Sequence, residues 1–499
     1  MIYVKITNEL KKFEADIRDL CMAFFPYQKL NFINGDNINV ERSVGATHRE
    51  PEVIVDGYFS GKLSGDRLTD KSEIKRQLYD YLSNLTGKKL LWGTLTGIRP
   101  VTIVTGLLEQ NKELNGSVGA STASPCNDKE LKSILKKEYY ISDTKTNELI
   151  DIAKREIKIL DRDEIRNYKN RYSIYVGVPF CKSTCLYCSF TSFNVDRYSD
   201  YIDKYLNAVD MEFKKRKGEI KITNNGLLNP LTVYIGGGTP TSLNEKQFER
   251  LLSIIDKYVD RKTCIEYTVE AGRPDTITKE KLLLMKDHGV SRISINPQSF
   301  NQKTLDLIGR KHKTEDVIEK FLLASSLGFD NINMDIILGL PNEHLLEVIN
   351  TLFNVYKLKP ESLTVHSLAL KRAARLNYEL DSWMKETYLA GIADANKTEG
   401  QRTIDKMYFM SNVLAKILNL KPYYLYRQKN MAGNLENIGF AKDGFECIYN
   451  IMMMSERHTV YGFGTATSKE VFYENGNKRV ESIEGYKSVI DYCKANINI

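Results

Sequence analysis

The chain has 499 residues, and its 71 lysines and arginines exceed its 64 aspartates and glutamates to give a mild net charge of +7. Its length of about three typical domains and its hydrophobic share of 42% allow a substantial core, whereas the charge is too small to favour a nucleic-acid partner. Residues 1–10 lack a signal-peptide core, and no apolar run is long enough for a membrane span, so we expect a cytoplasmic protein.

The first part of the chain has the pattern of a separate α/β unit. A helix expected to end at Gly87 fits the preference for glycine just after a helix. Residues 115–126 are small and polar, which is typical of a surface loop, and the charged residues 161–170 indicate a domain boundary. The expected elements are strands over residues 1–7 and 51–58 and helices over residues 10–25, 71–85, 128–140 and 143–160.

Residues 171–370 alternate regularly between apolar strands and amphipathic helices. Six strands in such an alternation predict a parallel sheet with right-handed crossovers. In folds of this kind the functional groups lie at the C-terminal ends of the strands. The expected strands cover residues 173–178, 231–235, 263–270, 292–296, 331–338 and 363–368, and the main helices cover residues 198–217, 245–259, 279–288 and 345–357.

The last part of the chain is less regular, and we expect it to be mostly helical. It also contains a tyrosine-rich stretch at residues 422–428, a glycine-rich strand at residues 460–467 and a hairpin turn at Asn475 and Gly476. The predicted domains are therefore an N-terminal α/β domain over residues 1–165, a βα-repeat domain over residues 171–370 and a C-terminal domain over residues 371–499.

Three of the eight cysteines lie close together, directly after the first strand of the repeat. Cys181, Cys185 and Cys188 have the spacing C-x-x-x-C-x-x-C. Eight cysteines are too few for a disulfide scaffold in a chain of this length, and the three could be plain packing residues. A zinc site would need a fourth ligand, and neither a second C-x-x-C nor a histidine pair lies nearby. The remaining interpretation is a [4Fe–4S] cluster held by three thiolates, with one iron open for a ligand.

This cysteine motif resembles the signature of radical S-adenosylmethionine enzymes. Over residues 171–370 the resemblance is closest to the oxygen-independent coproporphyrinogen III dehydrogenase group, through the segments YVGVPFC, GGGTP, PQSF, GR and MDIILGLP. The segments GTLTGIRP, VHSLALKRAARLN and YRQKNMAGNLENIGF resemble its HemZ-type branch. The implied fold is α/β, with a partial (β/α)6 radical-SAM barrel, a separate N-terminal α/β domain and a mostly α C-terminal extension.

The resemblance implies a role for each matching residue. The three cysteines would bind the [4Fe–4S] cluster, and the open iron would bind S-adenosylmethionine. Arg310 would pair with the methionine carboxylate, and Asp335 would accept hydrogen bonds from the ribose. Each residue of the set could instead be an ordinary structural residue. The expected cofactor-binding residues are Tyr175, Tyr187, Gly237, Gly238, Thr239, Glu270, Gln298, Arg310 and Asp335.

The resemblance also implies a reaction, in which two propionates of coproporphyrinogen III become vinyl groups and give protoporphyrinogen IX. A reductant protein such as flavodoxin or ferredoxin would supply the electron. Carboxylates need cations, although a cluster of cations could equally be a solvated face. The candidate substrate-binding residues are Lys371, Arg372, Arg375, Arg427 and Lys429.

Two departures from the group's pattern bear on this reaction. The chain has Gly177 where the group carries a histidine, and Phe190 where it carries a fourth cysteine. Neither departure touches the expected cluster or cofactor ligands. Two alternatives therefore stay open: a related heme-binding chaperone, which hands heme to other proteins, and a radical methyltransferase that acts on heme.

Overall fold

The computed structural model divides the chain into two compact units. Unit 1 comprises Met1–Ala153, Ile392–Arg402 and Tyr426–Glu436, and unit 2 comprises Lys154–Gly391, Thr403–Leu425 and Asn437–Ile499. The three-domain division expected from the sequence stays a prediction. The structure describes residues 2–25, 29–34, 53–97, 99–116, 127–190, 192–220, 227–369, 371, 374–376, 403–428, 431, 434–474 and 477–497.

Unit 1 is built on a small parallel sheet with the strand order β2-β1-β3. Inward side chains of the central strand pack on α1 and α3 in one buried core, which includes Val4, Phe24 and Leu78. The expected C-cap at Gly87 is confirmed, since Gly87 has φ 68° and its N–H donates to Ser83 O at 2.8 Å. The elements are β1 (Ile2–Ile6), α1 (Glu14–Phe24), β2 (Leu30–Asn34), β3 (Val53–Val55), α3 (Arg67–Thr86), α4 (Val101–Gly116), α5 (Asp128–Tyr139) and α6 (Asp143–Leu160), the last of which continues into unit 2.

Two of these elements, β2 and α4, were not expected from the sequence. Part of the expected surface loop, residues 117–126, lies outside the described residues. Helix α3 begins earlier than expected, because the Asp66 side chain accepts a hydrogen bond from Thr69 N at 2.9 Å and so caps its first turn.

Unit 2 contains a sheet in which six parallel strands follow one another in chain order, as the alternating pattern predicted. Buried apolar residues fill the strands almost continuously, which is typical of a parallel sheet covered by helices. The six strands are β4 (Tyr172–Val178), β7 (Thr232–Gly237), β8 (Glu266–Glu270), β9 (Arg292–Ser294), β10 (Ile332–Leu338) and β11 (Ser362–Ser367).

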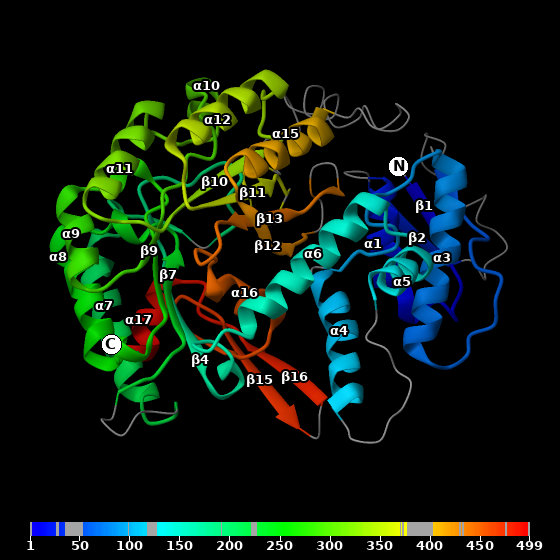
Figure 1. Ribbon diagram of the computed structural model, residues 1–499, viewed down its shortest axis with the longest axis horizontal. Helices are drawn as coiled ribbons and strands as arrows, with labels where there is room; N and C mark the ends of the chain where they lie inside the picture. Colours follow the sequence, from blue (N-terminus) through cyan, green and yellow to red (C-terminus); the bar gives the residue numbers. More distant parts are fainter. Residues whose placement is uncertain are drawn as a thin grey trace. The chain divides into compact units, whose positions relative to one another are not determined.

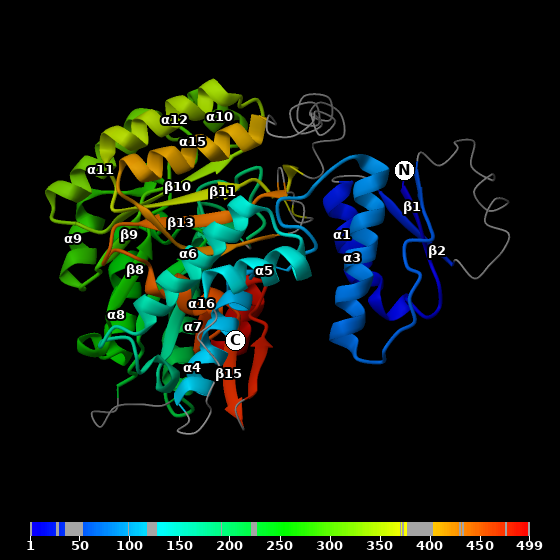
Figure 2. The same ribbon diagram turned by 45° about the vertical axis from the view of Figure 1, so that its right-hand side comes forward.

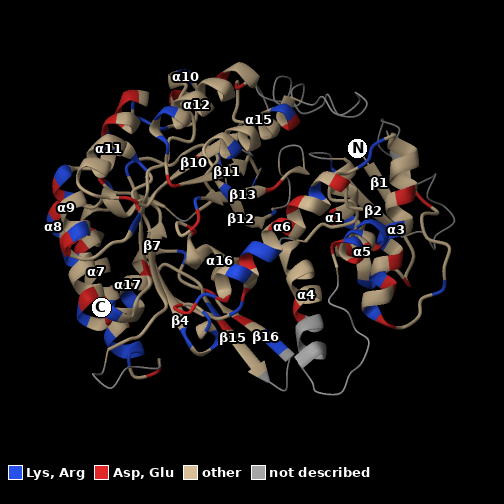
Figure 3. Cartoon of the chain, in the orientation of Figure 1, with Lys and Arg blue, Asp and Glu red and all other residues tan. Residues whose placement is uncertain are grey.

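Helices cover the outer side of these strands in both views (Figures 1 and 2). Each expected crossover helix is present, and α8 carries a capping box in which Asn244 accepts from Gln247 N. Lysines, arginines and acidic residues alternate on α8 and α9, so these helices present a mixed-charge surface (Figure 3). The helices are α7 (Ser199–Arg216), α8 (Glu245–Tyr258), α9 (Lys279–Asp287), α10 (Gln302–Leu307), α11 (Thr314–Ser326) and α12 (Leu345–Leu358).

The C-terminal part contains more strand than we expected. Strand β13 adds antiparallel to β11 at one side, and β14 adds parallel to β4 at the other, so the described sheet is extended at both ends rather than closed. Strands β15 and β16 pair up to Glu474 and Asn477, although the two expected turn residues between them lie outside the described residues. The elements are α15 (Thr403–Ile417), β12 (Lys421–Tyr426), β13 (Asn437–Ala441), α16 (Ile448–Ser455), β14 (Thr459–Gly464), β15 (Ser468–Glu474), β16 (Asn477–Ile483) and α17 (Val489–Ile497).

Among the described helices, none combines the length and the apolar character that crossing a membrane requires.

Candidate active site

The cysteine motif follows β4 at the C-terminal edge of the parallel sheet. Cys181 ends the short strand β5 (Phe180–Cys181), which pairs with β6 (Phe193–Asn194). Cys181 and Cys185 are buried, Cys188 is half-buried, and all three are free thiols. The loop is anchored at its centre, because Leu186 N donates to Ile308 O at 2.9 Å.

The glycine segment after β7 packs directly against the start of the cysteine loop. Gly238 N donates to Val178 O at 2.7 Å, and Thr239 N donates to Phe180 O at 2.8 Å. A Cβ on Gly238 would stand 2.7 Å from Phe180 O, so a larger residue does not fit there. The Thr239 hydroxyl lies 3.3 Å from Cys181 Sγ. The fold itself thus requires Gly238, and Thr239 borders the first cysteine.

Glu270 ends β8 and is hydrogen-bonded to a stack of tyrosines. The Tyr234 hydroxyl donates to Glu270 Oε1 at 2.7 Å. The Tyr234 ring stacks on the rings of Tyr175 and Tyr449, with distances between ring centroids of 5.8 Å and 4.5 Å. Burial raises the pKa of Glu270 to about 7; the Tyr234 hydrogen bond opposes the rise, and the nearby charge of Asp335 adds to it. Glu270 therefore changes charge near neutral pH, and Tyr175 belongs to its surroundings.

Gln298, a few residues beyond β9, lies beside Asp335 in the middle of β10. Gln298 N donates to Asp335 O at 3.0 Å, and Gln298 has the left-handed φ of 62°. The Gln298 Oε1 atom is buried without a hydrogen-bond partner. Although burial favours the protonated acid, His366 and hydrogen bonds from Asn333 and Thr364 lower the pKa of Asp335. Asp335 is thus an ionised hydrogen-bond acceptor. The side-chain oxygen of Gln298 is a neutral acceptor to which none of the described residues donates.

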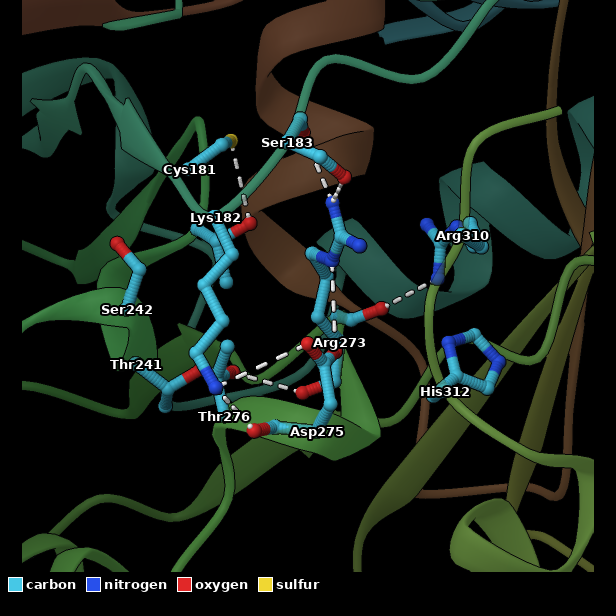
Figure 4. A network of polar contacts seen from close by, with 12 residues as sticks. Cys181, Lys182, Ser183, Thr241, Ser242, Arg273, Asp275, Thr276, Arg310 and His312 are labelled. Atoms are coloured by element: carbon cyan, nitrogen blue, oxygen red, sulfur yellow. Dashed lines mark hydrogen bonds and ion pairs between the residues drawn. The ribbon is translucent and has the colours of Figure 1, made fainter. Parts of the chain in front are cut away.

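Arg310 connects these groups to the cysteine loop. Its Nη1 donates to Gly272 O at 2.9 Å and to Asn296 O at 2.8 Å, and its Nε is buried without a partner. Its guanidinium also interacts with the side chains of Tyr187 and Cys185. Figure 4 shows Arg310 beside the buried ring of His312, facing the segment that carries Arg273. A fixed cation therefore lies next to the second cysteine.

The residues of this edge fit a cluster and its cofactor. Three thiols on one short loop are soft ligands of the kind that iron–sulfur clusters use, and cations of Arg273, Arg310 and Lys371 act on them. Unpartnered buried atoms on Gln298 and Arg310 offer an acceptor and a donor to a polar ligand. In the described part of the chain no three histidine, cysteine or acidic side chains already stand as a metal-binding group. Burial raises the pKa of Cys181 to about 11, so its thiol is neutral until iron replaces the proton.

The five candidate substrate cations are distributed over both units. In unit 2, Lys371 stands over the Phe190 ring at 5.2 Å and acts on Cys188, while Arg375 is exposed. In unit 1, Arg427 is buried and donates to Asn434 Oδ1 at 2.7 Å and to Leu95 O. Arg372 and Lys429 lie outside the described residues.

Sequence reasoning missed the residues that follow Glu270. Arg273, Asp275 and Thr276 contact the cysteine and glycine loops, and none of them was named as a candidate. The available signal was their position, since the segment EAGRPDT comes directly after the third barrel strand, where functional groups gather.

Comparisons with known proteins give the class of this chain. The model of the radical SAM superfamily matches residues 175–353, which include the cysteine loop and strands β7 to β10. Members of this superfamily use a [4Fe–4S] cluster and S-adenosylmethionine.

Individual relatives narrow the class further. The chain is 35% identical to the oxygen-independent coproporphyrinogen-III oxidase-like protein HemZ of Bacillus subtilis, over 92% of this chain and 89% of that protein. It is 34% identical to the heme chaperone HemW of Lactococcus lactis, over 59% of this chain and 69% of that protein. The solved structure of the radical SAM enzyme HemN, the coproporphyrinogen III oxidase of Escherichia coli, overlaps 67% of this chain and 76% of its own, with 20% identity and a TM-score of 0.47. The chain belongs to the radical SAM superfamily and, within it, to the family of the HemZ oxidase-like protein.

Proposed function

We propose that this protein is a cytoplasmic oxidoreductase that converts two propionates of coproporphyrinogen III to vinyl groups. In each conversion the cleaved S-adenosylmethionine takes one hydrogen atom, an electron acceptor takes one electron, and carbon dioxide is released; after both conversions the product is protoporphyrinogen IX. A flavodoxin or ferredoxin would supply the reducing electron. The cofactor and substrate residues expected from the sequence are part of this proposal. The near full-length similarity to the HemZ oxidase-like protein supports it, because the heme chaperone HemW of Lactococcus lactis matches a smaller share of this chain.

The observation that carries the proposal is the position of Lys371 beside the cysteine loop. Its charge acts on Cys188, and its Nζ stands 5.2 Å from the centre of the Phe190 ring. The segment that follows Lys371 is tied to the same loop, because Leu376 N donates to Leu186 O at 2.9 Å. A cation held there suits an anionic carboxylate whose carbon chain must come close to the cluster. Lys371 is thus the substrate candidate with the strongest geometric support.

The other residues would hold the cofactors and control charge. The bound cluster and S-adenosylmethionine supply radical chemistry, the removal of a hydrogen atom from an unactivated carbon. Arg310 would hold the carboxylate of the cofactor and Asp335 its ribose hydroxyls, because the first is a fixed cation and the second an ionised acceptor. Glu270 would become fully ionised when a cationic ligand group binds beside it.

A side chain at position 177, where the resembling enzymes carry a histidine, would be tightly packed in this structure. A Cβ on Gly177 would stand 3.1 Å from Ala466 Cβ and 3.3 Å from the Thr465 carbonyl carbon. The Gly177 carbonyl also accepts from the Tyr205 hydroxyl at 2.8 Å. The turn between β14 and β15 thus leaves little room for a side chain at this position.

An anaerobic assay tests the proposal. The cluster is reconstituted, and S-adenosylmethionine, a reductant and coproporphyrinogen III are added; we expect protoporphyrinogen IX with two carbon dioxide molecules per turnover. Lys371→Ala should raise KM for the porphyrinogen, whereas Lys214→Ala, on the outer helix α7, should leave KM unchanged. Cleavage of S-adenosylmethionine without vinyl formation would exclude the proposed reaction.

A heme chaperone is the second candidate function, and one observation favours it. Phe190, at the position of the missing fourth cysteine, is 64% exposed beside the cysteine loop, as suits an aromatic contact for a flat apolar ligand. The chaperone function predicts stoichiometric heme binding that Phe190→Ala weakens, heme transfer to an acceptor protein and no vinyl product. The dehydrogenase function instead predicts that the same preparation forms the vinyl product.

A further inference from the structure

One short segment joins three loops of the candidate site. Residues 271–276 follow β8 and end in the one-turn helix η5 (Pro274–Thr276). Within this segment Arg273 reaches the cysteine loop, where its Nη1 donates to Ser183 O at 2.8 Å and to Ser183 Oγ at 2.9 Å. Ser183 lies midway between Cys181 and Cys185 and its hydroxyl donates in turn to Gly309 O at 2.9 Å. The guanidinium thus holds the middle of the turn between the first two cysteines.

A second contact ties the same turn to the same short helix. The Lys182 Nζ donates to Asp275 O at 2.7 Å and lies 3.8 Å from its Oδ2. The Arg273 Nε lies 3.5 Å from Asp275 Oδ1, so the carboxylate stands between the two cations. Figure 4 shows Lys182 and Arg273 reaching toward Asp275 from the two sides. Two consecutive residues of the cysteine loop are therefore fixed to η5.

The segment is itself held at both ends. Thr276 Oγ1 and Thr241 Oγ1 are 2.6 Å apart, and the buried Lys281 Nζ donates to the carbonyl oxygens of both threonines. At the other end Arg310 donates to Gly272 O. The segment therefore cannot move without disturbing the glycine loop and Arg310, and this rigidity is passed on to the cysteine turn.

The burial of Arg273 shows that its position is specific. Arg273 is 3% exposed, its Nη2 is buried without a hydrogen-bond partner, and its contact with the Asp275 carboxylate is long, at 3.5 Å. Burying a guanidinium with incomplete pairing is costly. An anionic group beside the cysteines would offset that cost, and the charge of Arg273 already acts on Cys181.

We propose that Arg273 is a positioning residue for the iron–sulfur cluster, which holds the turn between Cys181 and Cys185 through Ser183. Its positive charge also stabilises the more negative, reduced form of the cluster and so raises the reduction potential. The proposal depends on the cluster, which the family uses, and not on the porphyrinogen, so its failure and the failure of the proposed reaction are distinguishable.

The test compares reconstituted Arg273→Ala with the wild type under anaerobic conditions. We expect iron release to a chelator to become at least about tenfold faster, in line with the loss of an outer-shell contact. We also expect a more negative midpoint potential and a changed EPR spectrum of the reduced cluster. Arg250→Ala is the matched control, because Arg250 makes its contacts on exposed parts of α7 and α8.

Two further variants separate charge from position. Arg273→Lys keeps the positive charge but loses the planar guanidinium that donates to Ser183. In this variant the reduction potential should therefore be closer to the wild-type value than the rate of iron release is. Ser183→Ala keeps Arg273 and should speed iron release with a smaller change in potential. Wild-type iron retention and potential in folded Arg273→Ala would overturn the proposal. Should that variant not fold, wild-type values in both Arg273→Lys and Ser183→Ala would overturn it instead.

Discussion

The charge of Glu270 makes the stability of the cluster-free protein depend on pH. Burial raises the pKa of this carboxyl to about 7, well above its value in the unfolded chain. The folded state therefore favours the protonated acid, and this contribution is present at low pH and lost as the pH rises toward and through 7. We expect the melting temperature of the wild type, relative to Glu270→Gln, to fall between pH 5 and pH 8. A difference that stays constant over this range would contradict the assignment.

The three motif cysteines are expected to act as one unit in iron binding. Replacing any one of Cys181, Cys185 and Cys188 by alanine removes one of three protein ligands, so iron and sulfide content after reconstitution should fall close to zero. Cys264→Ala is the control, because this thiol donates to Glu266 O at 3.3 Å on the third strand and should leave iron loading unchanged. Normal iron loading in any of the three motif variants would contradict the ligand assignment.

At this scale the sequence identified residues with a strong local signal and missed those defined by contacts. The cysteines and the glycine segment follow strands that could be predicted, so their meeting at one edge could be predicted too. Arg273 looks like any other arginine in a loop, and its burial depends on a distant partner, Ser183. Such contacts follow from tertiary packing and leave no periodic pattern.

Hydrogen bonds to one carboxylate on β8 hold the short helix α16 against the sheet. Glu266 on β8 accepts from Ile448 N at 2.6 Å and from Tyr449 N at 3.2 Å, at the start of α16. Glu266→Ala leaves two buried N–H groups without acceptors, which costs about 2–4 kcal/mol of unfolding free energy. We expect a clear loss in melting temperature, with Glu280→Ala on the exposed face of α9 as the control. An unchanged melting temperature would show that α16 is held mainly by its apolar contacts.

Some helices and strands could be predicted from the sequence and others could not, as with the individual residues. The six parallel strands and their helices were predicted because each is a long apolar or amphipathic run. Strands β12 and β13 were not, because strands added at the edge of a sheet gain their stability from the neighbouring strand, β11 for β13 and β13 for β12, rather than from their own sequence. The described C-terminal part therefore contains strands beside the expected helices.

Considered as a whole, the chain folds into units that do not follow chain order. Unit 1 combines the first 153 residues with a segment from the C-terminal third, Tyr426–Glu436. Within unit 1, Glu436 is fully buried; its Oε2 accepts from Trp92 Nε1 at 2.8 Å, and its Oε1 pairs with the buried Lys145. The segment GTLTGIRP and the first part of YRQKNMAGNLENIGF, two segments that resemble the HemZ-type branch, therefore lie in one unit, where Arg427 donates to Leu95 O. This contact gives both segments a structural role whatever the substrate is.

The make-up of unit 1 allows a prediction of how a truncated chain behaves. A fragment of residues 1–153 keeps the core around β1 and α3 but lacks Glu436, so Trp92 loses its hydrogen-bond partner and Lys145 loses its ion pair with the buried Glu436. Losing the partner of a buried polar group costs about 1–3 kcal/mol, so we expect this part of the fragment to loosen. Trp92 is the sole tryptophan of the fragment, and its emission should shift to the red. A peptide of residues 421–440 should restore the blue-shifted emission, whereas the same peptide with Glu436→Gln should restore it poorly. Blue-shifted emission from the fragment without any peptide would contradict the prediction.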